Sequence, residues 1–349
     1  MALKRLIPAS LRRRVRGNKA YRAWWLERQV AHPRPRRPKG VVVFAGLSRF
    51  HLSNPGKVTA ETYLPALCTV LREAGFDTRF VTSVAALEGA LDRALPAFVV
   101  MIYREEHDIP SGARLDAALA RAELVFNHPE TGRIVADKRR TNEVLTAAGV
   151  PMPRMVSAAD APVFSNAVAE SAQPVQVVES GASLDPFRYN TEFIDTRIEY
   201  GGKDYYSTVR VMCIGAKITH AFVRARDAAQ NDASVHTKDT PVDARMINDL
   251  HERLVEATWD HLSDIARRVS DALGPGFYAH DVLVERESGR VLVCETGFKF
   301  DNKQYSGALE PIRHLLPAWQ PFHSPADNAR NSAPHLIAAL EERLAASSA

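Results

Sequence analysis

Two carboxylates in the second half of the sequence have a spacing that could place them in one site. Asp281 and Glu295 lie in apolar stretches, residues 277–285 and 290–296, which we expect to form antiparallel strands joined by a short turn. A carboxylate in such a strand is costly to bury unless it is paired or bound to a metal. Because the turn brings the two strands together, both side chains can converge on one Mg²⁺, which prefers hard oxygen ligands and few protein carboxylates. The alternative is a pair of acids that face outward.

Three basic residues upstream are candidate anion-binding groups. Lys138 stands at the start of an expected helix over residues 138–149, and Arg210 and Arg224 lie in two successive expected strands. The ammonium group of a lysine offers phosphate a compact charge on a flexible stem. The planar fork of an arginine can pair bidentately with phosphate or carboxylate. Taken singly, a solvated lysine and two arginines on the exposed face of a hairpin are the favoured explanation of these residues.

The elements that must position these residues follow a clear order along the chain. Strands alternate with helices over residues 40–130, which predicts an α/β domain with a parallel sheet. Its expected strands are residues 41–45, 78–81, 97–103 and 123–126, and its expected helices are residues 59–75 and 111–121. Residues 131–225 are rich in strands, expected at 174–178, 189–194, 205–214 and 216–224, with Gly201-Gly202 and Gly215 as turns. Residues 226–349 contain an expected long helix over 245–273, the two carboxylate-bearing strands and a C-terminal helix near 333–346.

Length and composition indicate a globular protein of several subdomains. A chain of 349 residues exceeds the usual size of one hydrophobic core. Its three cysteines, Cys68, Cys213 and Cys294, lie in apolar runs, which favours buried thiols in a reducing compartment over a disulfide framework. Neither an apolar run long enough for a membrane span nor a secretory signal is expected. These features predict a cytoplasmic location.

The N-terminal 39 residues form a separate basic segment in our interpretation. The net charge of the chain is only +4, yet the first 40 residues contain thirteen Lys or Arg. We expect a helix followed by a linker in the proline cluster from Pro33 to Pro38. Arginines beside Trp24 and Trp25 fit an anchor for an anionic membrane surface or RNA, through residues 1–38. The alternative is a helix that docks its aromatic face on the rest of the protein.

Three segments together resemble the nucleotide site of the ATP-grasp superfamily. The first runs from Asn127 to Pro153, with Asp137-Lys138 at a helix start. The second is the hairpin from Tyr206 to Arg224, and the third runs from Phe277 to Glu295. The resemblance covers residues 41 to about 310 and is specific as a combination. The sequence is similar to carboxylate–amine ligases of the glutathione synthetase and ribosomal-protein glutamate ligase type.

The resemblance implies a fold, two cofactors and a role for each charged residue. The fold would be ATP-grasp, of α/β (α+β) class, with an N-terminal Rossmann-like pre-grasp domain after the basic extension. The cofactors would be ATP and Mg²⁺. By the resemblance, Lys138 contacts phosphate, Arg210 and Arg224 point at phosphate or acyl-phosphate, and Asp281 and Glu295 hold the metal.

The resemblance also implies an adenine-binding hinge and a reaction. The hinge would be the strand Glu192-Phe193-Ile194-Asp195, whose backbone hydrogen-bonds adenine, with Asp195 or Glu199 as the acid that holds the ribose hydroxyls. In the implied reaction, ATP phosphorylates a carboxylate, and an amine or another nucleophile displaces the phosphate. The substrates would be a small-molecule or peptide carboxylate and an amine, and a homo-oligomer is one expected state.

The sequence departs from the family pattern at two places. The usual Glu-x-Asn metal motif reads Glu295-Thr-Gly297, so Asp301 or Asn302 of the next loop is the expected third ligand. No lysine or arginine occurs in the expected strands of the middle region that usually bear a second phosphate-binding cation. Two alternatives therefore stay open, a catalytically impaired nucleotide-binding or scaffold protein of the same fold and an ATP-dependent kinase.

Other chemistries have little support in the sequence. The His-Glu-x-x-His, Cys-x-x-Cys, Gly-x-Ser-x-Gly and P-loop patterns do not occur. Weaker candidates for substrate contact follow two strands of the first domain, namely Arg49, His51, Asn54, Arg104, Glu105 and Glu106, and solvated loop residues explain them as well.

Overall fold

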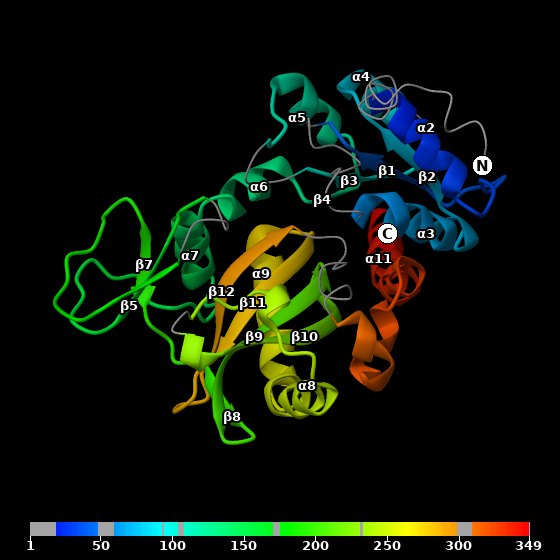
Figure 1. Ribbon diagram of the computed structural model, residues 1–349. Helices are drawn as coiled ribbons and strands as arrows, with labels where there is room; N and C mark the ends of the chain where they lie inside the picture. Colours follow the sequence, from blue (N-terminus) through cyan, green and yellow to red (C-terminus); the bar gives the residue numbers. More distant parts are fainter. Residues whose placement is uncertain are drawn as a thin grey trace, which may run out of the picture. The chain divides into compact units, whose positions relative to one another are not determined.

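The computed structural model describes residues 19–47, 59–92, 94–103, 108–169, 175–230, 233–298 and 309–348. The chain forms two compact units, labelled by element in Figure 1. Unit 1 comprises residues 1–129 and 324–349, and unit 2 comprises residues 130–323. Within the described residues, no helix is long and apolar enough to cross a membrane.

Unit 1 is built on the parallel sheet that the alternating pattern predicted. The strand order is β2 (Asp77–Val81), β1 (Val41–Ala45), β3 (Ala97–Met101) and β4 (Leu124–Phe126), and all pairs are parallel. Every residue of β1 and β3 is buried, as expected for strands covered on both faces. The helices are α2 (Lys19–Gln29), α3 (Thr59–Glu73), α4 (Val84–Leu91), α5 (Ala113–Leu119) and α11 (Pro325–Ser348).

The C-terminal helix α11 starts earlier than the sequence predicted and belongs to unit 1. It lies against α3 (Figure 1), and the hydroxyl groups of Tyr63 and Ser332 are 2.7 Å apart in a buried hydrogen bond. The parallel pairing of β1 to β4 confirms the predicted parallel sheet. The Rossmann-like character of this unit stays a prediction.

Helix α2 docks on the first unit through one apolar residue and one acid. Leu26 is fully buried, and Glu27 accepts a 2.6 Å hydrogen bond from Arg72, which is itself 4% exposed. By contrast, Tyr21 and Trp24 are exposed, and the Arg28 guanidinium lies 4.9 Å from the Trp24 ring centroid. The helix docks as the second interpretation predicted, but with its aromatic residues partly in solvent. Membrane or RNA contact stays a prediction, and residues 1–18 lie outside the described part of the chain.

Unit 2 contains two antiparallel sheets. The larger sheet has the order β10 (Lys217–Asp227), β9 (Lys203–Ile214), β11 (Phe277–Val284) and β12 (Val291–Phe298), with β8 (Arg197–Tyr200) also paired to β9. The smaller sheet has the order β6 (Gln176–Val178), β5 (Val163–Asn166) and β7 (Tyr189–Glu192). The helices of unit 2 are α6 (Pro129–Val135), α7 (Lys138–Ala147), α8 (Ala244–His251) and α9 (Trp259–Leu273).

Two elements of unit 2 differ from the sequence prediction. The expected helix over 245–273 is two helices separated by a π-helical turn, Glu252–Glu256. There the Thr258 hydroxyl donates to the Leu254 carbonyl at 2.6 Å, which competes with the regular backbone ladder. Strand β8 was not predicted because it is short, charged and paired on one edge. The expected Gly201-Gly202 turn joins it to β9, and both glycines have positive φ, 59° and 77°.

The core of unit 2 includes a buried histidine among aromatic rings. The His220 ring stacks on Phe322 with centroids 4.2 Å apart, and Phe222 and Trp319 complete the cluster. The His220 Nε2 atom is buried without a hydrogen-bond partner. Burial lowers the pKa of His220 to about 3 because the charged imidazolium is poorly solvated there.

This histidine predicts acid sensitivity. The unfolded chain protonates His220 near its ordinary pKa while the folded chain keeps it neutral, so stability falls as the pH drops from about 6.5 toward about 3, by up to about 1.4 kcal/mol per pH unit. We expect His220→Phe to reduce the stability lost between pH 7.5 and pH 5 by about 2 kcal/mol, measured by urea unfolding. The same substitution at exposed His261 should leave the loss unchanged. Equal losses in His220→Phe and the wild type would contradict this account.

Candidate functional site

The two arginines and two carboxylates singled out in the sequence share one face of the larger sheet. Asp281 of β11 is directly opposite Arg210 of β9 on one side and Glu295 of β12 on the other. Arg224 of β10 is opposite Thr208, two residues along β9 from Arg210 and therefore on the same face. The adjacent strand order, visible in Figure 1, thus converts distant sequence positions into neighbours.

Asp281 is held by both arginines. Arg210 donates from Nε and Nη2 to the two carboxylate oxygens at 2.8 and 2.7 Å, and Arg224 lies with Nη2 2.7 Å from Oδ1. The side chains of Arg224, Asp281 and Arg210 are only 6%, 17% and 21% exposed. Burial alone would raise the pKa of Asp281, but the charges and hydrogen bonds of Arg210 and Arg224 outweigh it and hold that pKa well below its ordinary value. We call these three residues the arginine–aspartate triad.

A register shift in β12 places one extra residue, Cys294, next to Glu295. Asp281 pairs with Glu295, but the next residue of β11, Val282, pairs with Val293, so Cys294 is an extra residue in β12. Such bulges re-aim side chains in the bulged strand. The Cys294 thiol is within electrostatic range of Glu295, Asp281, Lys138 and Arg224. Burial raises its pKa to about 12, the two carboxylates add to the rise, and the two cations oppose it.

Lys138 joins this group from a helix rather than from the sheet. It is the first residue of α7, which packs beside β12, and the lysine is only 7% exposed. Its ammonium group makes no hydrogen bond or ion pair with the residues that the structure describes. The same holds, within those residues, for the half-buried Glu295 carboxylate. We call Lys138, Arg210, Arg224, Asp281 and Glu295 the charged cluster.

The helix start that carries Lys138 is fixed by its neighbour. The Asp137 carboxylate accepts hydrogen bonds from the backbone N–H groups of Arg139 at 2.9 Å and Arg140 at 3.1 Å. The Lys138 backbone N–H donates to the Val168 carbonyl at 3.0 Å, which ties the helix start to the chain just beyond β5. Two separate contacts therefore set the position of the Lys138 backbone.

Removing the cap should loosen this helix start. Because Asp137 satisfies two otherwise unpaired N–H groups, we expect Asp137→Ala to lower the free energy of unfolding by about 1 kcal/mol, measured by denaturant titration. Asp137→Asn, which keeps an oxygen acceptor, should lose clearly less. An alanine variant as stable as the wild type would show that the cap is not needed.

The charged cluster fits phosphate groups better than it fits a lone cation. It holds three cationic and two anionic side chains, and its lysine is nearly buried without a partner among the described residues. Asp281 and Glu295 are placed opposite each other, as a shared magnesium would need, but both oxygens of Asp281 are engaged by arginines. Within the described residues, no group of three or more His, Cys, Asp or Glu side chains is arranged to hold a metal ion. Magnesium would therefore have to compete with two arginines for Asp281.

The predicted hinge residues make contacts within the chain. Asp195 accepts from Nε and Nη2 of Arg197 at 2.9 and 2.7 Å, and these hydrogen bonds lower its pKa. Glu199 accepts from the Gly202 backbone N–H at 2.6 Å, which closes the β8–β9 turn. The Glu192 Oε1 atom accepts from the Arg154 backbone N–H at 3.2 Å. The acids predicted to hold ribose are thus engaged in local contacts, and their roles stay predictions.

The middle two hinge residues lie against the sheet. The Phe193 backbone N–H donates to the Pro162 carbonyl at 3.2 Å, and the Phe193 ring meets Tyr206 edge-on at 6.5 Å between centroids. Ile194 is 6% exposed. Adenine binding by this segment stays a prediction.

The structure shows that Arg188 reaches β5, which the strand patterns in the sequence did not reveal. Arg188, the residue before β7, donates from Nε to the Ser165 hydroxyl at 2.9 Å and from Nη2 to the Ser165 carbonyl at 3.0 Å. Its guanidinium group therefore lies on β5, the strand whose continuation contacts the Lys138 backbone. An arginine directly before an expected strand was the available signal, but only the β5–β7 pairing shows where it reaches.

Several weaker candidates lie outside the described residues. These are the loop residues Arg49, His51 and Asn54, the stretch Arg104-Glu105-Glu106, and the expected additional metal ligands Asp301 and Asn302. Gly297 is described and pairs with Ala279 in the β11–β12 ladder.

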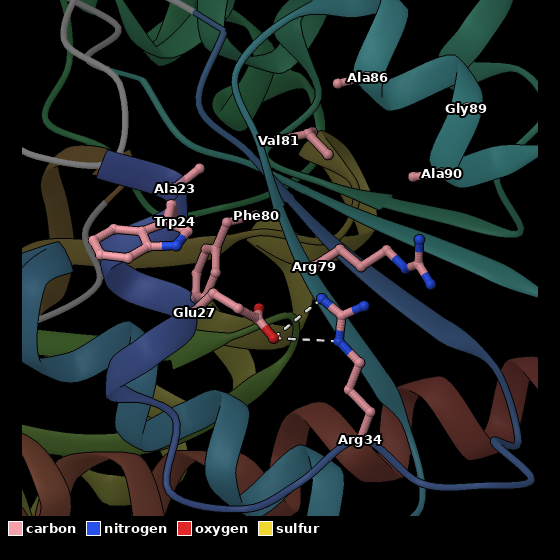
Figure 2. A pocket seen from close by; sticks show the side chains of 10 residues that line it. All are labelled: Ala23, Trp24, Glu27, Arg34, Arg79, Phe80, Val81, Ala86, Gly89 and Ala90. Carbon is pink, nitrogen blue, oxygen red and sulfur yellow. Dashed lines mark hydrogen bonds and ion pairs between the residues drawn. The ribbon is translucent and has the colours of Figure 1, made fainter. Parts of the chain in front are cut away.

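A groove of about 300 Å³ lies in unit 1 between α2, β2 and α4. Figure 2 shows Trp24, Phe80 and Val81 along it, with the small residues Ala86, Gly89 and Ala90 on the α4 side. Arg34 donates to Glu27 at 3.2 and 3.0 Å, and Arg79 donates to Asp77 at 3.0 and 2.9 Å. The arginines that line the groove are thus compensated within unit 1, and none of the predicted site residues lines it.

Comparisons with known proteins give similarity to solved structures only. No protein-family model and no curated protein matches the sequence. A RimK-domain ATP-grasp protein from Sphaerobacter thermophilus is 18% identical with a TM-score of 0.41, over 84% of this chain and 99% of that one. The ATP-grasp ligase PsnB, solved with a precursor variant, Mg and ADP, is 14% identical with a TM-score of 0.49, over 90% and 100%. D-alanine–D-alanine ligase from Bacillus anthracis is 10% identical with a TM-score of 0.46, over 86% and 98%.

The solved structures that resemble this chain include ATP-grasp proteins, the superfamily that the sequence resembles. The mixed parallel and antiparallel α/β architecture also agrees with the predicted fold class. At these identities and TM-scores the likeness carries no conclusion about the ligands or the reaction of this chain. The chemistry must therefore be argued from the residues of this chain.

Proposed function

We propose that the chain is an ATP- and Mg²⁺-dependent ligase of the ATP-grasp type, which activates a carboxylate as an acyl-phosphate for attack by an amine or another nucleophile. The observation that carries this proposal is that Lys138 is 7% exposed, has no hydrogen-bond or ion-pair partner among the described residues, and lies with Arg224, Asp281 and Glu295 within electrostatic range of the Cys294 thiol. A cation on a largely buried side chain, with other cations nearby and no ion-pair partner among the described residues, favours an anionic ligand. Polyphosphate supplies several negative oxygens at once.

The residues of the cluster would act by position and charge. In the proposed reaction the substrate carboxylate attacks the γ-phosphorus of ATP, ADP leaves, and the nucleophile then displaces phosphate from the acyl-phosphate. Lys138, Arg210 and Arg224 hold the phosphoryl oxygens in line and stabilise their charge, which is most of what phosphoryl transfer requires. Magnesium, when bound at Asp281 and Glu295, would supply further charge compensation.

Two readouts test the proposal. The full chain, ATP, Mg²⁺ and panels of carboxylates and amines should release ADP only with a matching pair. With ¹⁸O in the substrate carboxylate, one label should appear in the released phosphate, because that oxygen bridges to phosphorus in the acyl-phosphate. ADP release without label transfer would contradict the acyl-phosphate step.

The second candidate is a nucleotide-binding protein of the same fold without turnover. Gly297 at the usual asparagine position and the engagement of Asp281 by arginines favour it. It predicts ATP binding with no ADP release under any substrate combination. A third candidate, a kinase, would instead leave a stable phosphorylated product and no condensation.

A further inference from the structure

In the arginine–aspartate triad, the arginines that could bind an anion and the carboxylate that could bind a cation are engaged with each other. Both oxygens of Asp281 accept from Arg210, and Oδ1 is also 2.7 Å from Arg224. In this arrangement both oxygens of Asp281 already accept from arginines, so a metal would have to compete with two guanidinium cations for them, and the arginines use part of their hydrogen-bonding capacity on Asp281. A ligand that takes the arginines must therefore free the carboxylate.

The net charge of the charged cluster indicates whether an anion or a cation binds first. Lys138, Arg210 and Arg224 carry three positive charges, and Asp281 and Glu295 carry two negative ones, so the cluster is net positive. All five groups are buried or half-buried, where charges are weakly screened. A divalent cation entering alone meets a net positive site with one free carboxylate. An anion entering alone meets an unpartnered lysine and two arginines.

We propose that Lys138, Arg210 and Arg224 form an anion site that binds a polyphosphate group without metal, and that this anion draws the arginines from Asp281 and so creates the cation site. The inference concerns the ligand site of the proposed function and rests on it for the identity of the anion. It adds an order of binding, anion before cation. In the unliganded chain Asp281 holds Arg210 and Arg224 until the anion binds, and we call this role a latch. The anion and the cation then increase each other's affinity, as linkage requires.

Calorimetric titration of the full chain separates the two steps. We expect ADP to bind in the presence of EDTA, and Mg²⁺ alone to give no saturable binding at low millimolar concentration. Arg224→Met should weaken ADP binding in EDTA by about 10- to 100-fold, the usual worth of hydrogen bonds to charged groups. Lys217→Met, at an exposed position in the β9–β10 hairpin, should bind like the wild type.

A gain of cation binding tests the latch itself. In Arg210→Met/Arg224→Met, Asp281 is freed beside Glu295, and we expect Mg²⁺ alone to bind at least about tenfold more tightly than to the wild type. Because the freed carboxylate is costly to bury, the single variant Arg210→Met, which keeps one partner for Asp281, is measured as well and should show an intermediate gain. Circular dichroism confirms that each variant is folded.

The outcomes are distinct from those that test the reaction. Saturable binding of Mg²⁺ alone to the wild type, or ADP binding that requires metal, would overturn the order of binding even if the protein is a ligase. Folded arginine variants without any gain in Mg²⁺ affinity would overturn the latch. ADP binding in EDTA by a chain that turns over no substrate would support this inference while the ligase proposal fails.

Discussion

Replacing Asp281 with asparagine is expected to lower the free energy of unfolding by about 3–5 kcal/mol, because two largely buried guanidinium groups then lose their shared counter-charge. Urea or guanidinium titration monitored by tryptophan fluorescence measures the loss. The matched control is Asp264→Asn, which breaks ion pairs to Arg267 and Arg268 whose side chains are 40–55% exposed. That change should cost far less than Asp281→Asn, because solvent screens exposed ion pairs.

A second experiment on the same triad separates its effect on stability from its effect on ATP binding. Replacing all three members with apolar residues, in Arg210→Met/Asp281→Leu/Arg224→Met, should restore stability to within about 1 kcal/mol of the wild type or raise it, since buried ion pairs are costly to desolvate. ATP binding should be lost in this variant. If Asp281→Asn is as stable as the wild type, the ion pairs described here do not form in solution.

Glu295→Gln should reduce turnover by about 10²- to 10³-fold, the scale of loss when one preorganised charged or polar group is removed from an active site, because the amide is a weaker ligand for the proposed magnesium ion. The carboxylate has no hydrogen bond or ion pair with described residues, so its replacement by an isosteric amide should leave the unfolding midpoint nearly unchanged. ADP release under saturating ATP and Mg²⁺ measures the effect. Glu287→Gln, in the exposed turn between β11 and β12, is the matched control and should keep full activity. Full activity of Glu295→Gln would remove Glu295 from the site.

Local sequence patterns predicted much of what positions the site. The turn through residues 287–290 and the flanking apolar runs fixed the β11–β12 hairpin, and hence the placement of Asp281 opposite Glu295. The helix over residues 138–149 was predicted from the sequence, and Asp137 provides its cap. In these cases the determining interactions lie within a few residues of each other.

The partners of Asp281 could not be predicted in the same way. Arg210 is 71 residues from Asp281, and their contact depends on the register between β9 and β11, two strands that are not consecutive. No local rule sets that register. The same limitation concealed Arg188, whose reach depends on the β5–β7 pairing, and Cys294, whose orientation depends on the bulge opposite Asp281.

The central claim is that the charged cluster binds the phosphates of a nucleotide, and equilibrium binding of a non-hydrolysable ATP analogue tests it most directly. Three forms of the full chain are compared: the wild type, Lys138→Met and Lys217→Met. We expect saturable binding to the wild type, equal binding to Lys217→Met, and binding weaker by about 10- to 100-fold in Lys138→Met, because a nearly buried ammonium group is lost. Equal affinity of all three forms, or no binding by the wild type, would contradict the assignment of this site.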